Sequence, residues 1–422
     1  MLATLYAACA DPPKKPNRGG AGAAGTAGET VGEAGMSEEG GRPSTAGTGG
    51  TGGKGSEEAG MGGELAAEGG MGGEAGEAGS NGGTGGALPE ACTGLTIGKS
   101  NMPAPPTTNV AKPNGAVGGL KVINWAGFKG AISYTFDDSL QSQTTHYEAL
   151  NAVGIHVTFY LNNFNQGSNP IWEKAVADGH ELGNHTVHHC HADGSGCVNG
   201  TFTTVDKELD DNTAFLMAKK GVTGVYTFAT PFGDNNWTDA ASQRFLAARS
   251  VSDSNGGITP TGNFSAFTLP CHVANEGETA ATGPNGGFNK LSDDVRTAGS
   301  WRTILMHNID PDITDYGFNP VKLEEAVAAM TYTKSLGDVW ADTVVAVASY
   351  WQGQKALAGV QPKTVGSDKV YSWTLPAHFP PGMYLRATVT GGKVKQCGTE
   401  LTWDEHGYYE INLDAGSLTI SP

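Results

Sequence analysis

From about residue 122 onward, short apolar runs alternate with amphipathic segments, and each apolar run breaks at a polar residue or at a proline. The runs are AISYTF, VTFYLN, VYTFATPFG and TILMHNID, and the segment HELGNHTVHH stands between the second and the third of them. Between them, TTHYEALNAVG and IWEKAVADG have the spacing and length of helices, and Gly179 closes the second. Alternating strands and helices of these lengths predict parallel βαβ units, arranged as an α/β barrel or an open sheet.

A different pattern occupies the C-terminal end of the chain. VYSWTL, MYLRATV, KVKQC, LTW and YYEINL alternate apolar with polar residues, and Gly391-Gly392 is a ready hairpin turn. This pattern predicts a small module of antiparallel β-strands over 362–422. Its aromatic residues either pack in its core or form a platform for stacking on sugars; they are Trp373, Trp403, Tyr408 and Tyr409.

A glycine-rich segment near the N-terminal end of the sequence has almost no large apolar residues to bury. Residues 19–91 are dominated by glycine, and we expect them to be a disordered linker. Residues 1–18 read as the remnant of a lipoprotein signal, in which Cys9 would carry a lipid anchor. We therefore expect an exported protein, either attached to the cell envelope or secreted.

The charge and the cysteine content limit which partners and which compartment the sequence allows. The net charge is −17 with no basic run, which argues against nucleic acid as a partner. The sequence contains no run of 18 apolar residues, so it predicts no membrane-spanning helix. The six cysteines fit an exported protein, and Cys190 and Cys197 either close a small disulfide loop or join the neighbouring histidines as metal ligands.

The candidate chemistry lies where the predicted strands end. Four of them end at reactive or turn-forming groups, namely Asp137-Asp138, His185 with His189, Pro231-Phe232-Gly233 and His307. In parallel α/β folds the C-terminal edge of the sheet carries the active site. A structural turn explains a single aspartate pair, but it explains four such strand ends poorly.

The spacing of His185 and His189 predicts a metal site. Two imidazoles four residues apart can reach one ion from a helical turn or from a tight loop. Two imidazoles and one carboxylate make a three-ligand site for a divalent metal, with a position left open for water. One aspartate of the pair would then be a ligand, and the other could act as a base.

These motifs resemble those of the polysaccharide deacetylases of the NodB-homology type, carbohydrate esterase family four. TFDD over 135–138, HTVHH over 185–189 and LMH over 305–307 occur in the family's order. The resemblance extends from Val122 to Trp351, and we expect a catalytic domain over 118–355. It implies a distorted, incomplete (β/α) barrel that removes acetyl groups from amino sugars or from xylan.

The resemblance also assigns roles to individual residues. It implies a general base at Asp137, a general acid at His307 and metal ligands at Asp138, His185 and His189. One divalent ion is expected, zinc by default, with cobalt or nickel as alternatives. Oxyanion and substrate contacts are implied for the Phe232 N–H and its neighbours Pro231 and Gly233.

The chain departs from the family pattern at two places. Ala229 stands where many members have an arginine that pairs with the aspartate base, and Arg249 or Arg244 could replace that arginine in space. The family's fourth motif is not obvious; Asp253 could orient His307 or simply form a turn. The long polar segment over 255–300 either shapes access to the site or is a surface insertion.

We therefore expect a metal-dependent hydrolase that acts on an N-acetylated amino sugar polymer. One alternative is an O-acetyl esterase, for example on xylan, with the same scaffold. The other is a catalytically silent, carbohydrate-binding lipoprotein. The presence of Asp137, Asp138, His185, His189 and His307 argues against silence, and Ala229 argues weakly for it.

Overall fold

The computed structural model describes residues 92–253, 257–284, 286–313 and 318–422, and these belong to one compact unit. The expectations for residues 1–18 and 19–91, including the lipid anchor at Cys9, lie outside the described residues and stay predictions.

Parallel strands form the first part of the fold, as the alternating pattern predicts. They follow the order β6-β5-β4-β3-β2-β8-β7, and β9 pairs with the first residues of β2. Leu269 bridges to Arg249 on β6, and its N–H donates to Ala248 over 2.9 Å, so the sheet is nearly closed into a barrel. The expected (β/α) barrel is thereby confirmed. The strands are β2 (Gly130–Asp137), β3 (Thr158–Leu161), β4 (Glu181–Asn184), β5 (Thr227–Ala229), β6 (Ala247–Arg249), β7 (Cys271–Val273), β8 (Trp301–Met306) and β9 (Val339–Ala341).

The central strand β2 is buried on both faces, which explains its nearly continuous apolar sequence. Tyr134 and Phe136 face outward and join the core beneath the helices. Ser133 faces inward, where its hydroxyl accepts from Nε1 of Trp301 over 3.1 Å. Because side chains alternate along a strand, Asp137 shares the inward direction of Ser133.

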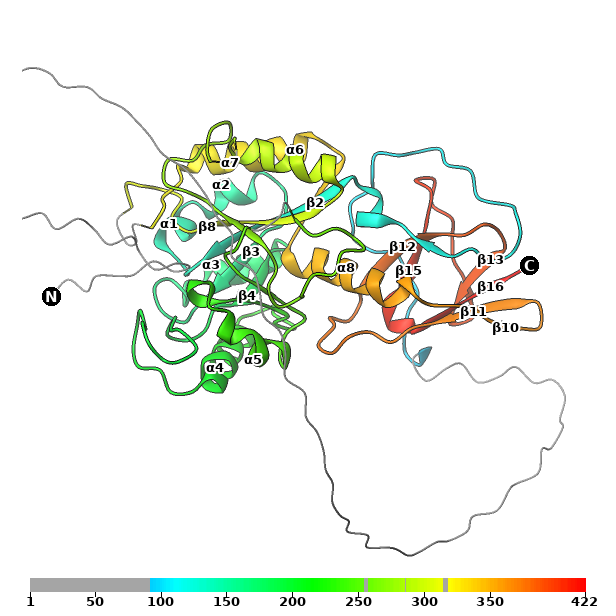
Figure 1. Cartoon of the computed structure of the whole chain (residues 1–422), viewed down its shortest axis with the longest axis horizontal. Helices are drawn as coiled ribbons and strands as arrows, with labels where there is room; N and C mark the ends of the chain where they lie inside the picture. The colour runs from blue at the N-terminus through cyan, green and yellow to red at the C-terminus, as the bar shows by residue number, and fades with distance from the viewer. Residues whose placement is uncertain (1–91, 254–256, 285, 314–317) are drawn as a thin grey trace, which may run out of the picture. The chain divides into compact units, whose positions relative to one another are not determined.

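Helices cover the outside of the barrel, with α6 and α7 on one side and α4 and α5 on another (Figure 1). Threonine caps begin two of them: Thr204 accepts from the Lys207 N–H, and Thr343 from the Ala346 N–H. The helices are α1 (Gln141–Thr145), α2 (Tyr147–Asn151), α3 (Ile171–Ala177), α4 (Val205–Met217), α5 (Thr238–Ser242), α6 (Phe288–Ala298), α7 (Leu323–Ser335) and α8 (Val344–Ala358). Short 3-10 turns are η2 (Asn124–Gly127), η3 (Pro231–Gly233), η4 (Asn235–Trp237) and η5 (Leu413–Ala415).

The segment over 255–300 was expected either to shape access to the site or to be a surface insertion, and two of its elements are part of the barrel. It supplies β7, which pairs in parallel with β8. It also supplies α6, whose Phe288, Leu291 and Val295 are buried in the main core. The polar composition concealed this role because β7 has only three residues.

The C-terminal residues form antiparallel sheets, as predicted. One sheet has the order β1-β12-β15 and the other β10-β11-β16-β13-β14. The strands are β1 (Lys121–Val122), β10 (Lys363–Val365), β11 (Asp368–Ser372), β12 (Tyr384–Thr388), β13 (Lys393–Gln396), β14 (Thr399–Glu400), β15 (Tyr409–Asn412) and β16 (Ser417–Ser421). Strand β1 comes from the segment that precedes the barrel, so chain segments far apart in sequence share one sheet.

Three of the four aromatic residues named for this module are packed in its interior. Trp373, Tyr408 and Tyr409 are buried. Nε1 of Trp373 donates to the Leu413 carbonyl, and Nε1 of Trp403 donates to the Val110 carbonyl, each over 2.9 Å. Trp403 is half-buried, and its ring meets that of Tyr409 edge-on at 5.1 Å between ring centres.

Candidate active site

The structure brings the candidate metal ligands together at the C-terminal edge of the barrel. Asp138, His185 and His189 each offer one ligand atom, and these atoms lie within 4.8 Å of one another. Oδ1 of Asp138 lies 3.4 Å from Nε2 of His185 and 3.7 Å from Nε2 of His189. All three residues are buried.

Hydrogen bonding fixes which atom of His185 faces the cluster. Its Nδ1 donates to the Ala229 carbonyl oxygen over 2.8 Å, so the neutral ring carries its lone pair on Nε2. Nε2 of His185 and Oδ2 of Asp138 are buried and have no hydrogen-bond partner within the described residues. Such atoms carry a desolvation cost unless a further group pairs with them.

The pKa values of the cluster follow from its charges. Burial opposes ionisation of Asp138, but the imidazoles of His185 and His189 outweigh it and lower the pKa of that carboxyl. Burial likewise disfavours the charged form of His185, yet the carboxylates of Asp137 and Asp138 raise its pKa. The site therefore favours an ionised aspartate facing two imidazole rings.

A tight loop, and not a helical turn, aims the two histidines. Thr186 and His189 have φ values of 62° and 50°, and the Thr186 hydroxyl accepts from the His189 N–H over 3.0 Å. From α4, Glu208 holds the same loop: its Oε2 accepts from the N–H groups of Val187 and His188 over 3.0 and 2.8 Å. Oε1 of Glu208 lies 2.6 Å from Nδ1 of His188, so this histidine is used in support of the loop.

The loop is closed on its other side by a disulfide between Cys190 and Cys197. Of the two readings that the sequence allowed for these cysteines, the structure therefore has the disulfide. A second disulfide joins Cys92 to Cys397 across 305 residues of sequence, and no spacing signal could have assigned it. Among the described residues Cys271 is the free cysteine.

Asp137 has an arginine partner although residue 229 is alanine. Its Oδ2 forms a buried ion pair with Nη2 of Arg249, and the guanidinium also lies over the Tyr160 ring at 5.1 Å. Arg244, the other residue that could have served, pairs instead with Asp206 and Asp210 at the surface. Oδ2 of Asp137 also lies 3.6 Å from Nε2 of His185.

His307 directly follows β8 and is buried beside this group. The Phe318 ring meets its imidazole edge-on at 5.0 Å between ring centres. Burial lowers the pKa of His307, against the opposing attraction of the Asp138 and Asp137 carboxylates. His307 is thus close enough to the cluster to respond to its charge.

Residues 231–233 form a 3-10 turn beside the metal-ligand candidates. Phe232 has a φ of 57°, and its ring meets His189 edge-on at 4.5 Å and stacks on His191 at 4.3 Å. Pro231 has no N–H, and the Gly233 N–H already donates to the Thr230 carbonyl. Phe232 is therefore the residue of this turn whose N–H is available within the described part of the chain.

Asp253 is placed in a different network from the one expected. It lies 3.3 Å from Nδ1 of His272 and 3.2 Å from Nη2 of Arg302. Nε2 of His272 lies 3.0 Å from the Glu278 carboxylate. A role of Asp253 in orienting His307 stays a prediction.

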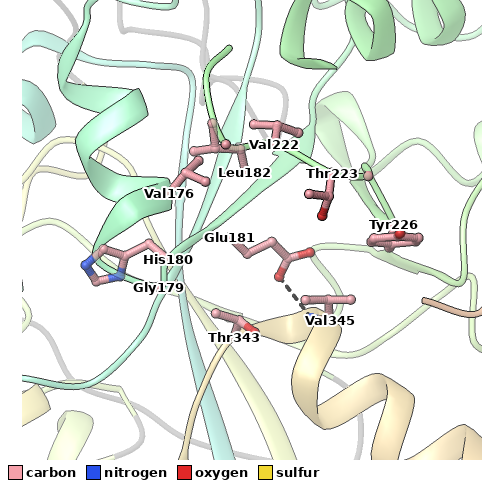
Figure 2. A pocket seen from close by; sticks show the side chains of 12 residues that line it. Val176, Gly179, His180, Glu181, Leu182, Val222, Thr223, Tyr226, Thr343 and Val345 are labelled. Carbon is pink, nitrogen blue, oxygen red and sulfur yellow. Dashed lines mark hydrogen bonds between the residues drawn. The ribbon is translucent and has the colours of Figure 1, made fainter. Parts of the chain in front are cut away.

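A cavity of about 190 Å³ lies at the opposite edge of the barrel, where β4 begins (Figure 2). Glu181 points into it and accepts from the Val345 N–H at the start of α8 over 2.9 Å. Hydroxyls of Thr227 and Thr158 satisfy the same carboxylate. The cavity is separated from the candidate site by the length of β4. The carboxylate of Glu181 is already used in hydrogen bonds that hold β4, its neighbouring strands and α8 together.

Buried carboxylates and imidazoles at the C-terminal edge of a nearly closed parallel barrel are the arrangement of an enzyme active site. Residues 127–250 match the model of the family described as polysaccharide deacetylase. This segment is therefore a polysaccharide deacetylase domain, and the resemblance drawn from the motifs is confirmed for it. The match contains the candidate metal ligands, Asp137 and Arg249.

Comparisons with individual proteins give the following likenesses. A gellan lyase from Bacillus sp is 31% identical over 134 residues, which are 31% of this chain and 5% of that protein, so the chain spans a small fraction of this relative. A candidate polysaccharide deacetylase from Mycobacterium smegmatis has 17% identity and a TM-score of 0.37, with 61% of this chain and 98% of that chain covered. A peptidoglycan deacetylase from Bacillus subtilis has 19% identity and a TM-score of 0.32, with 54% and 91% covered. None of the helices in the described part of the chain has the length and apolar character needed to cross a membrane.

Proposed function

We propose that the protein is a metal-dependent hydrolase that removes acetyl groups from a polysaccharide, with an N-acetylated amino sugar polymer as substrate. The observation that carries this proposal is the buried cluster of Asp138, His185 and His189 beside Asp137 and His307.

The residues of the cluster fit a divalent metal. Oδ2 of Asp138 and Nε2 of His185 are buried without a hydrogen-bond partner within the described residues, as atoms that bind a metal would be in its absence. One carboxylate and two imidazoles suit zinc first, and cobalt or nickel as alternatives. When bound, such an ion would polarise an acetyl carbonyl and acidify water.

Asp137 would act as the general base. It is held by the Arg249 ion pair, which fixes its orientation in the barrel interior. A positioned carboxylate at this place can take the proton from an attacking water. Arg249 thus supplies what the alanine at position 229 lacks, which also supports an active enzyme over a silent binding protein.

His307 would act as the general acid. Because burial lowers its pKa, a proton held on this imidazole passes more readily to a departing amine or alcohol. On the other side, the Phe232 N–H in the 3-10 turn would donate to the oxyanion that forms at the acetyl carbon, with Pro231 and Gly233 shaping the turn.

The same groups would also cleave an O-acetyl ester, so an acetyl esterase acting on a glycan such as xylan is the second candidate. We further propose that the protein is exported and is attached to the cell envelope through Cys9 or secreted. The two disulfides support an oxidising compartment.

Acetate release by the full chain from matched N-acetylated and O-acetylated glycans tests the proposal. We expect release from the N-acetylated polymer, its loss after chelation and its return with added zinc, cobalt or nickel. Release from O-acetylated glycans alone would select the esterase, and no release from any of them would contradict the proposed function.

A further inference from the structure

Gln143 connects the ends of two barrel strands through its side chain. It lies in α1, immediately after the Asp137-Asp138 turn, and is fully buried. Its Nε2 donates to the main-chain carbonyl oxygens of Asp137 over 2.6 Å and of His307 over 3.0 Å. Its Oε1 accepts from the Leu140 N–H over 3.2 Å. One carboxamide thus contacts β2, its following turn and the residue after β8.

These contacts lie just beyond the end of the hydrogen-bonded ladder between β2 and β8. The parallel register between β2 and β8 ends with the pair of Phe136 and Met306, and Asp137 and His307 are the next residues on each strand. Gln143 therefore joins the two chains one position beyond the last ladder pair. Residues at equal register on parallel strands point to the same side of the sheet, so the joined positions carry the two candidate acid–base groups.

We propose that Gln143 is a positioning residue that sets the separation of Asp137 and His307, an inference that rests on the proposed function. Both protons of its amide are used by the two carbonyls. A glutamate would place an acceptor against them, and a methionine of similar shape would leave both without this donor. Acid–base catalysis depends on placement within a fraction of an ångström, so loss of the clamp acts on turnover.

The same helix offers a matched control. The hydroxyl of Ser142, also buried, accepts from the Ile309 N–H over 3.3 Å. It ties α1 to the same segment after β8 but contacts neither the Asp137 nor the His307 carbonyl in the bonds described above. If α1 had only a structural role, Gln143→Met and Ser142→Ala would change kcat by similar factors.

The test measures kcat, KM and bound metal for the full chain carrying each substitution. For Gln143→Met we expect kcat to fall roughly 10- to 100-fold, with KM within about threefold and metal stoichiometry unchanged. Ser142→Ala should keep kcat within about twofold. A kcat for folded Gln143→Met that matches the wild type, or an equal fall in both variants, would overturn the assignment.

Amide hydrogen exchange of the same proteins gives a reading that does not need activity. Gln143→Met should speed exchange in peptides that end β2 and in peptides that end β8, whereas Ser142→Ala should affect only the latter. Unchanged exchange in Gln143→Met would overturn the clamp. A wild type that releases no acetate, with this exchange pattern present, would count against the proposed function and leave the clamp standing.

Discussion

At the residue scale, Arg249 and Ala229 are direct register partners on the neighbouring strands β6 and β5. An arginine at either position would enter the barrel at the same level. The guanidinium can therefore reach Asp137 from one strand further along the sheet. This explains how the chain dispenses with an arginine at position 229 while it keeps the buried ion pair.

We predict that Arg249→Ala lowers kcat roughly 10²–10⁴-fold, as expected for a general base that has lost its orientation. It should also destabilise the fold by about 3–5 kcal/mol, because a buried carboxylate is left without its cation. The double variant Ala229→Arg/Arg249→Ala should recover part of the lost activity. Steady-state kinetics and urea unfolding measure both effects.

Arg244→Ala is the control for this prediction, since the ion pairs of Arg244 are with the surface carboxylates of Asp206 and Asp210. It should change stability by less than about 1 kcal/mol and leave kcat unchanged. If Arg249→Ala retained wild-type turnover, the assignment of Asp137 as an arginine-supported base would be wrong.

At the element scale, β7 is fastened by the pair of carboxylates that flank His272. Burial favours the neutral imidazole, but hydrogen bonds with Asp253 and Glu278 prevail and raise the pKa of His272 to about 9. The charged groups around it are these two carboxylates and Arg302, which pairs with Asp253. The segment that looked like a polar insertion thus contains a buried charge network.

This network predicts how stability changes with pH. The folded pKa of His272 lies above the ordinary value of 6.5, so its contribution is complete below about pH 6.5 and is lost as the pH rises through about 9. The loss should be at most about 3 kcal/mol. Urea unfolding of wild type and His272→Gln should show the two stability curves converging toward pH 9.

The control for the pH prediction is His378→Asn, since His378 is exposed. Its stability curve should run parallel to that of the wild type over the same pH range. A constant difference between wild type and His272→Gln from pH 6 to 10 would contradict the role of His272.

Local sequence patterns were enough to predict the elements that end in functional groups. The end of a strand and the spacing of the HTVHH histidines each depend on only a few consecutive residues. They could not select Arg249 over Arg244, since that choice depends on the register between β5 and β6. The support of the HTVHH loop by Glu208 likewise depends on how α4 packs. The barrel role of β7 was missed because three residues are too few to show a period.

At the scale of the whole described unit, one buried arginine ties three parts of the chain together. Nη1 of Arg386, on β12, donates to the carbonyls of Pro103 and Ala126 over 2.8 and 2.9 Å, and Nη2 donates to Met102 over 3.0 Å. Glu410 balances its charge at 3.3 Å. The C-terminal strands therefore act with residues 102–126 as a support for the start of the barrel, and such long-range contacts carry no local sequence signal.

The central claim is that a metal site and a separate base act together in this barrel. Metal titration and acetate release, measured side by side on wild type, Asp138→Asn and Asp137→Asn, test it most directly. Asp138→Asn should lower the metal affinity tenfold or more, because changes around a bound metal typically lower its affinity about 10–100-fold. Added metal should then restore part of the activity of this variant. Asp137→Asn should bind one ion as the wild type does, yet lose turnover roughly 10²–10⁴-fold with no recovery. Equal metal loss in both variants would contradict the division of roles, and wild-type activity that survives complete metal removal would contradict the account as a whole.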